Sequence, residues 1–123
     1  MQSSPTTVVL VVDDVGATRS GLAELLRLKG YEALEAGNGQ EALNLLFSHP
    51  GVAVVVLDMN MPGSSGRWFR EQQLSDPRIA HIPVILFTGA RDLPADDELR
   101  FSERLRKPFA IEALLHAVRR YAS

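Results

Sequence analysis

The chain has 123 residues, of which 46% are hydrophobic and 23% are charged, and this balance predicts one globular domain that can bury a core. It contains no cysteine, which excludes disulfides, thiol catalysis and cysteine-ligated zinc. The net charge of -2 shows no overall excess of positive charge that would attract nucleic acid, so we expect no direct binding to DNA or RNA.

No stretch of the sequence is apolar for long enough to cross a membrane. The longest apolar run, residues 52–57, is far shorter than the ~20 residues that a spanning helix needs. Residues 1–7 are polar and lack the basic start and apolar core of a signal peptide. We therefore expect a cytoplasmic protein with no membrane partner, in which residues 1–6 form a flexible tail and residues 7–123 form the domain.

The first predicted strand is the apolar run Val8–Val12, which ends at two carboxylates, Asp13 and Asp14. Leucines at helical spacing follow it, and the helix they predict ends near Gly30. Residues 31–36 have mixed polarity and predict a weaker strand near an edge of the sheet.

A capping pattern predicts where the second helix begins. Asn38 and Glu41 have the spacing of the N-cap and N3 residues of a capping box. The apolar residues after them predict an inward face made by Ala42, Leu45 and Leu46.

The central predicted element is the run 52–57, which ends at Asp58. Its six apolar and mostly β-branched residues are typical of a strand that is buried on both faces in a parallel sheet. A proline and two glycines in the next eight residues predict a turn, after which Ser64 or Ser65 can cap a helix over residues 66–74.

The second half of the chain predicts two more strands, one over residues 82–87 that ends at Thr88, and a weaker one over residues 103–106 that ends at Lys107. Residues 89–101 are irregular and predict one short helix between these strands. The last helix has the clearest apolar stripe, made by Ile111, Leu114, Leu115 and Val118.

Five strands that alternate with five helices indicate an α/β fold, a three-layer sandwich with a five-stranded parallel sheet. Right-handed crossovers place the carboxyl ends of all strands at one edge of the sheet, where ligands bind in open α/β folds. Five polar residues are expected at this edge: Asp13, Asp14, Asp58, Thr88 and Lys107.

Three crowded carboxylates repel one another, so the cluster needs a bound cation or a raised pKa. Oxygen ligands without thiolate or imidazole favour a hard ion, and Mg2+ fits best. A carboxylate such as Asp58 that borders an open position can attack a phosphoryl donor and form an aspartyl phosphate. Lys107 would supply positive charge to the transferred group, and the Thr88 hydroxyl would donate a hydrogen bond.

Each of these residues also has an ordinary structural interpretation. An aspartate at the end of a strand is more often a turn former or a helix cap, and Asp14 could cap the first helix. Thr88 alone would be a common strand residue, and Lys107 alone a solvated charge. The coincidence of five suitable residues at the ends of four strands favours the chemical interpretation.

This pattern resembles the receiver domain of two-component response regulators. The matching elements follow the order of that family from Val8 to Tyr121: Asp13-Asp14, Asp58 with Met61-Pro62 and Gly66, Thr88-Gly89-Ala90, and Lys107-Pro108-Phe109. The resemblance implies the flavodoxin-like strand order 2-1-3-4-5.

The resemblance also implies a function. Asp58 would accept a phosphoryl group from a histidine kinase or histidine phosphotransfer protein, and Thr88 and Lys107 would contact that group. The implied ligands of Mg2+ are Asp13, Asp14, Asp58 and the main-chain carbonyl of Asn60. The chain would catalyse its own phosphorylation and dephosphorylation without being a conventional enzyme, and it would act on a downstream protein target or output domain that the sequence does not identify.

Two departures from the family pattern concern the last strand. Arg104 stands three residues before the lysine, where receivers usually carry an aromatic residue that takes part in switching. Arg100 and Phe101 replace the usual Gly-Ala before that strand. We therefore expect that the signal leaves this domain in a way that differs from typical members.

Two other functions are compatible with parts of the pattern. One is a pseudo-receiver, an interaction module that binds partners without phosphorylation and need show no affinity for Mg2+. The other is a haloacid-dehalogenase-like phosphatase, which usually has a second aspartate two residues after its nucleophile. Asn60 occupies that position here and cannot act as a general acid.

Overall fold

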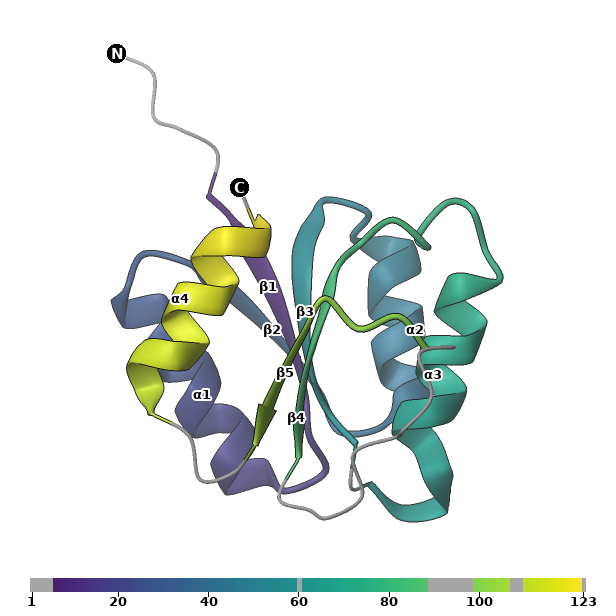
Figure 1. Ribbon diagram of the computed structural model, residues 1–123, viewed down its shortest axis with the longest axis horizontal. Coiled ribbons are helices and arrows are strands. Elements are labelled where there is room, and N and C mark those ends of the chain that lie inside the picture. Colours follow the sequence, from purple (N-terminus) through teal and green to yellow (C-terminus); the bar gives the residue numbers. More distant parts are fainter. Residues whose placement is uncertain (1–5, 60, 89–98, 107–109, 123) are drawn as a thin grey trace.

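Five parallel strands form one sheet at the centre of the protein (Figure 1). The computed structural model describes residues 6–59, 61–88, 99–106 and 110–122, with only the backbone of Ser64 and Thr88. The strands are β1 (Val8–Val12), β2 (Glu32–Ala36), β3 (Val52–Asp58), β4 (Val84–Thr88) and β5 (Glu103–Arg106). Their order is β2-β1-β3-β4-β5, and every neighbouring pair is parallel, which confirms the predicted sheet.

Helices cover both faces of the sheet and make the three predicted layers. The described residues form the helices α1 (Gly16–Leu28), α2 (Gly39–Ser48), α3 (Ser65–Leu74) and α4 (Ile111–Ala122), with a 3-10 turn at Pro62–Ser64 before α3. Helices α1 and α4 lie on one face, and α2 and α3 lie on the other (Figure 1). The short helix predicted within residues 89–101 falls mostly outside the described residues. Within the described ranges, no helix has the length and apolar character needed to cross a membrane.

The central strands are buried on both faces, because alternate residues of a strand point to opposite sides of the sheet. In β1, Val9 and Val11 belong to the apolar layer below α1 and α4, while Leu10 and Val12 belong to the layer below α2 and α3. The continuous apolar runs therefore supply both layers of the core, as the sequence predicts.

The strand β5 forms despite its polar composition because it lies at an edge of the sheet. It pairs only with β4 among the described strands, in a register that places Thr88 beside Arg106. Its two arginines, Arg104 and Arg106, are exposed, and Leu105 packs against the layer below α4. A strand at the edge of a sheet can have one polar face in solvent and one apolar face against the core with little loss of stability.

Two element boundaries differ slightly from the prediction, each for a local reason. The strand β4 begins at Val84, because Pro83 has no N–H and the Ile82 N–H closes a turn onto Ile79 O at 3.1 Å. The helix α3 begins at Ser65, one residue earlier than expected. The hydroxyl of Ser65 accepts a hydrogen bond from the Gly39 N–H and so joins α3 to the start of α2.

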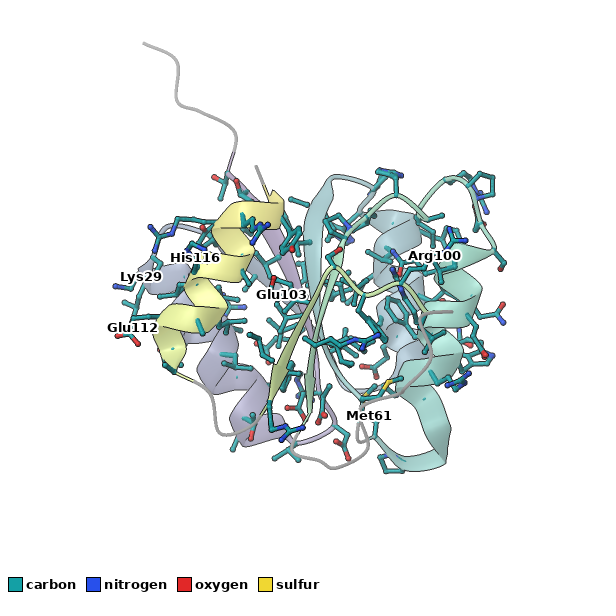
Figure 2. The ribbon with its side chains drawn as sticks, viewed as in Figure 1. Lys29, Met61, Arg100, Glu103, Glu112 and His116 are labelled. Carbon is teal, nitrogen blue, oxygen red and sulfur yellow. The ribbon has the colours of Figure 1, made fainter. Side chains whose placement is uncertain are left out.

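Helix α3 buries two polar side chains, Arg70 (3% exposed) and Gln73 (0% exposed). The guanidinium of Arg70 donates to Leu99 O and Arg100 O, both at 2.7 Å, and to Gln73 Oε1 at 2.6 Å. Burial lowers the pKa of Arg70 to about 10, which leaves the guanidinium protonated at neutral pH. Figure 2 labels Arg100 on the α3 side of the sheet, where Arg70 holds the chain that leads into β5.

The predicted residues Asn38 and Glu41 form the N-cap of α2, with one difference in their hydrogen bonds. Asn38 Oδ1 accepts the Glu41 N–H at 2.9 Å, as a capping box requires. The Glu41 carboxylate accepts the N–H of Gly37 at 2.8 Å, one residue before the cap. This pair therefore satisfies two backbone donors at the turn between β2 and α2.

Replacing Asn38 with alanine should lower the free energy of unfolding by about 1 kcal/mol, because the Glu41 N–H loses its acceptor. Urea denaturation of the purified domain measures this change. The control is Asn44→Ala on the exposed face of the same helix, which should change stability much less because alanine favours a helix interior. Equal losses in both variants would contradict the capping role.

Candidate functional site

The ends of β1 and β3 bring three carboxylates together. Asp13 directly follows β1 and Asp58 is the last residue of β3, and the two strands are neighbours in the sheet. Carboxylate oxygens of Asp13, Asp14 and Asp58 all lie within 4.8 Å of one another. The structure thus assembles the three acidic residues that the sequence places at this edge.

Two of the three carboxylates are removed from solvent. Asp13 is 0% exposed and Asp58 is 2% exposed, whereas Asp14 is exposed. The Val15 N–H donates to Asp13 Oδ1 at 2.9 Å. Val15 itself is the N-cap of α1 and makes no side-chain cap, so the alternative in which Asp14 caps this helix is wrong.

The donor set fits a hard divalent cation. All three groups offer oxygen, and burying crowded carboxylates is costly unless a positive charge shares the site. Opposite ligands of an octahedral Mg2+ are about 4.2 Å apart, because each lies about 2.1 Å from the ion. Oxygens within 4.8 Å of one another can therefore bind one such ion after small movements.

The start of α3 packs tightly against the end of β3. A Cβ atom on Gly66 would lie 3.0 Å from the main-chain oxygen of Asp58 and 3.4 Å from Met59 Sδ, so glycine lets α3 begin against the strand end. Met61 is buried, and Figure 2 labels it at the same edge of the sheet. This packing holds the start of α3 against Asp58 and Met59.

The remaining predicted site residues are described less completely. Thr88 is the last residue of β4, and its backbone lies at the same edge as Asp58, which pairs with Phe87. Asn60 and Lys107 lie outside the described residues. The roles that the resemblance implies for these three residues therefore stay predictions.

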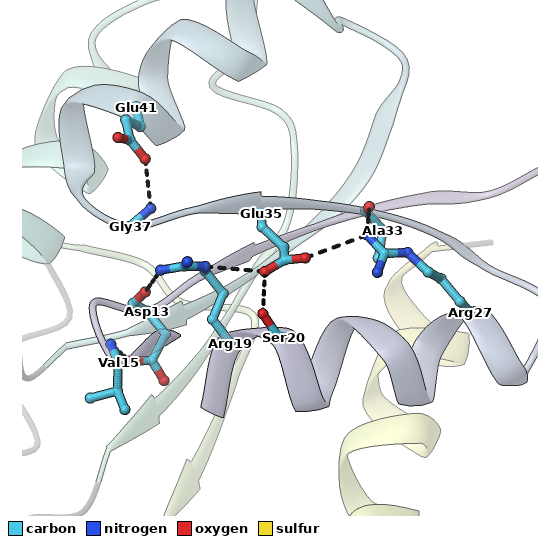
Figure 3. Close-up of polar contacts among 9 residues, drawn as sticks. All are labelled: Asp13, Val15, Arg19, Ser20, Arg27, Ala33, Glu35, Gly37 and Glu41. Carbon is cyan, nitrogen blue, oxygen red and sulfur yellow. Dashed lines mark hydrogen bonds and ion pairs between the residues drawn. The ribbon is translucent and has the colours of Figure 1, made fainter. Parts of the chain in front are cut away.

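A cation that the sequence pattern does not indicate, Arg19, lies beside the acidic cluster. Arg19 Nη1 donates to the main-chain oxygen of Asp13 at 3.0 Å, and its Nε donates to Glu35 Oε1 at 3.2 Å (Figure 3). Asp13 and Glu35 belong to separate segments joined by α1, so neither local spacing nor polarity signals this contact. Only the pairing of β1 with β2 brings the three residues together.

The chain is similar to known proteins along almost its whole length. A family model of the response regulator receiver domain matches residues 9–119. The sensory transduction protein RegX3 of Mycolicibacterium smegmatis is 35% identical over 117 residues, which cover 92% of this chain and 49% of that protein. The chain thus spans about half the length of this curated relative.

Solved structures agree with this family. Chemotaxis protein CheY4 of Vibrio cholerae superposes with a TM-score of 0.84 at 27% identity, covering 95% of this chain and 99% of that one. Response regulator protein TrrA of Thermotoga maritima, solved in complex with Mg(2+)-BeF, has a TM-score of 0.82 at 31% identity and covers 94% of this chain and 99% of that one. From its sequence and its fold, the chain belongs to the family of response regulator receiver domains.

Proposed function

We propose that this protein is a phosphorylation-controlled switch that accepts a phosphoryl group on Asp58 in a Mg2+-dependent reaction. The observation that carries the proposal is the group of three carboxylates at the ends of β1 and β3. Membership of the receiver family supports signalling in a two-component system, with a histidine kinase or histidine phosphotransfer protein as the donor.

The chemistry assigns a distinct task to each residue. Asp13, Asp14 and Asp58 would hold Mg2+ together with the main-chain carbonyl of Asn60. When bound, the ion supplies positive charge to the oxygens of the transferred group. A carboxylate oxygen of Asp58 attacks phosphorus as the bond from phosphorus to the donor nitrogen breaks, and the electron pair of that bond leaves with the imidazole.

Two further residues would act on the transferred group itself. The Lys107 ammonium would pair with one phosphoryl oxygen, and the Thr88 hydroxyl would donate to another. Water would later hydrolyse the acyl phosphate and return Asp58 to its carboxylate form. Residues 7–123 would form this switch, with residues 1–6 as a tail.

The phosphorylated form would change the binding of a protein target or of an output domain in the cytoplasm, with no direct contact to nucleic acid or membrane. The exposed side of β5 carries Arg104 where receivers usually have an aromatic residue. We therefore expect the surface that transmits the signal to differ in chemistry from that of typical members.

The test is labelling with acetyl phosphate, followed by mass spectrometry of the intact protein. Wild type with Mg2+ should gain the mass of one phosphoryl group, and Asp58→Asn should gain none because an amide cannot form the acyl phosphate. Wild type with Mg2+ removed by a chelator should be labelled far more slowly. The matched control is Asp76→Asn, whose carboxylate pairs with Arg78 at a distant turn and whose loss should leave labelling intact.

Labelling of Asp58→Asn at the wild-type rate would contradict the assignment of the acceptor. A wild-type protein that neither binds Mg2+ nor becomes labelled would favour the phosphorylation-independent interaction module. Multiple turnover of a generic phosphate ester would instead favour the phosphatase.

A further inference from the structure

The main chain of Asp13 is held from both sides. Its N–H donates to Ala36 O in β2 at 3.1 Å, and its C=O accepts from Arg19 Nη1 at 3.0 Å. The Asp13 side chain is held as well, because Oδ1 accepts the Val15 N–H. The position of this buried carboxylate thus depends on β2 and on α1, the helix that carries Arg19.

Arg19 is in turn fixed by Glu35 (Figure 3). Glu35 Oε1 accepts both Arg19 Nε at 3.2 Å and Ser20 Oγ at 3.0 Å, and Glu35 Oε2 lies 3.5 Å from Arg27 Nη2. Partial burial opposes the charge of Glu35, but these hydrogen bonds and the two arginines outweigh it and hold the pKa of Glu35 below its usual value. Glu35 therefore stays ionised and keeps Arg19 in place at neutral pH.

The guanidinium of Arg19 also lies between the turn after β2 and the start of α1. A Cβ atom on Gly37, in the turn after β2, would lie 3.2 Å from Arg19 Nη1. A Cβ atom on Gly16, at the start of α1, would lie 3.7 Å from Arg19 Nη2. The side chain of Arg19 is 24% exposed, so its contact with Asp13 O is partly shielded from solvent.

We propose that Arg19, anchored by Glu35, is a positioning residue for the acidic cluster and raises its affinity for Mg2+. The inference rests on the proposed function, which places the ion among Asp13, Asp14 and Asp58. Arg19 bonds to the main-chain oxygen of Asp13, so this bond orients the ligand without using a carboxylate oxygen. Outer residues that orient metal ligands typically change metal affinity about 10-fold or more when they are removed.

The direction of the change in Mg2+ affinity distinguishes the positioning role of Arg19 from the effect of its charge. Removing a positive charge near a cation site favours binding of the cation by simple electrostatics. Loss of the bond to Asp13 has the opposite effect, because the ligand is then less well oriented. A weaker affinity in a variant that lacks Arg19 therefore cannot arise from its charge.

The experiment measures Mg2+ affinity by isothermal titration calorimetry in wild type, Arg19→Gln and Arg27→Gln. Both variants lose one positive charge that pairs with Glu35, but Arg27 donates to Ala33 O at 2.8 Å and not to Asp13. We expect affinity about 10-fold weaker in Arg19→Gln, and affinity like that of wild type in Arg27→Gln. Arg19→Lys, which keeps the charge but has a single donor nitrogen, should recover part of the loss.

The titration also separates this inference from the function on which it rests. A wild-type protein that binds no Mg2+ would refute both. If wild type binds Mg2+ and Arg19→Gln binds it with unchanged or tighter affinity, only the role of Arg19 is refuted. The same holds if Arg19→Gln and Arg27→Gln both bind Mg2+ more weakly by the same factor. If Arg19→Gln does not fold, as judged by its unfolding transition, Arg19→Lys and Arg27→Lys give a comparison at constant charge, in which only Arg19→Lys should bind Mg2+ more weakly than wild type, by less than about 10-fold.

Discussion

Replacing Arg70 with alanine should lower the free energy of unfolding by about 4 kcal/mol, a loss expected when several buried acceptors lose one charged donor. Three oxygens accept from this guanidinium, those of Leu99 and Arg100 in the main chain and Oε1 of Gln73. The side chain is 3% exposed, so water cannot easily replace it. The ring of Phe101 lies 5.5 Å below the guanidinium and would lose a cation–π contact as well.

Urea denaturation of the wild type and two variants tests this prediction. Arg70→Met keeps most of the side-chain volume but has no donor, so it should be nearly as unstable as Arg70→Ala. Gln72→Ala is the control, because this long polar side chain is exposed on the same helix and its loss should change stability little. Wild-type stability in Arg70→Met would show that packing, and not hydrogen bonding, is the contribution of Arg70.

The second large effect is expected at Gly39, the first residue of α2. A Cβ atom there would lie 2.4 Å from Ser65 O and 2.7 Å from Ser65 Oγ, both closer than van der Waals contact allows. The Ser65 carbonyl belongs to the backbone of α3 and cannot rotate away. Gly39→Ala should therefore separate α2 from α3 and cost about 3 kcal/mol of unfolding free energy, at the upper end for an overpacked site.

Gly21→Ala is a control in which the free energy of unfolding should change in the opposite direction. Gly21 lies on the exposed side of α1, where an added Cβ would meet nothing within 4 Å. Alanine there should raise the free energy of unfolding by about 1 kcal/mol, because it favours the helix. A thermal melt that shifts upward for Gly21→Ala and downward for Gly39→Ala is the expected result. A Gly39→Ala protein as stable as the wild type would show that α3 can move away from α2 freely.

The layers were predictable because the relevant signals are local, whereas the strand order was expected only from the resemblance to receiver domains. The apolar runs at Val8–Val12 and residues 52–57 indicate strands buried on both faces, and the structure has them as β1 and β3. The acidic cluster was predictable for the same reason, since Asp13 and Asp58 directly follow or end those strands. Once neighbouring parallel strands are assigned, the positions of their last residues follow from the topology.

The polar interior of α3 could not be predicted, because its partners are distant in the sequence. Nothing in the local sequence indicates that the polar residues Arg70 and Gln73 are buried. In the structure Trp68 is 36% exposed and both polar side chains are buried. Gln73 Nε2 donates to Ile79 O and Ile82 O, and Arg70 reaches the chain before β5, so tertiary contacts decide which face is inward.

The acceptors of Arg70 in the segment before β5 are backbone carbonyls, which every amino acid possesses. The side chain at position 100 is consequently free to change because it is exposed, although the backbone φ of +47° favours asparagine or glycine and disfavours β-branched residues. Position 70 has no such freedom, because only a long side chain with several donors reaches both carbonyls. In a saturation mutagenesis screen, tolerated replacements should therefore be plentiful at 100 and scarce at 70.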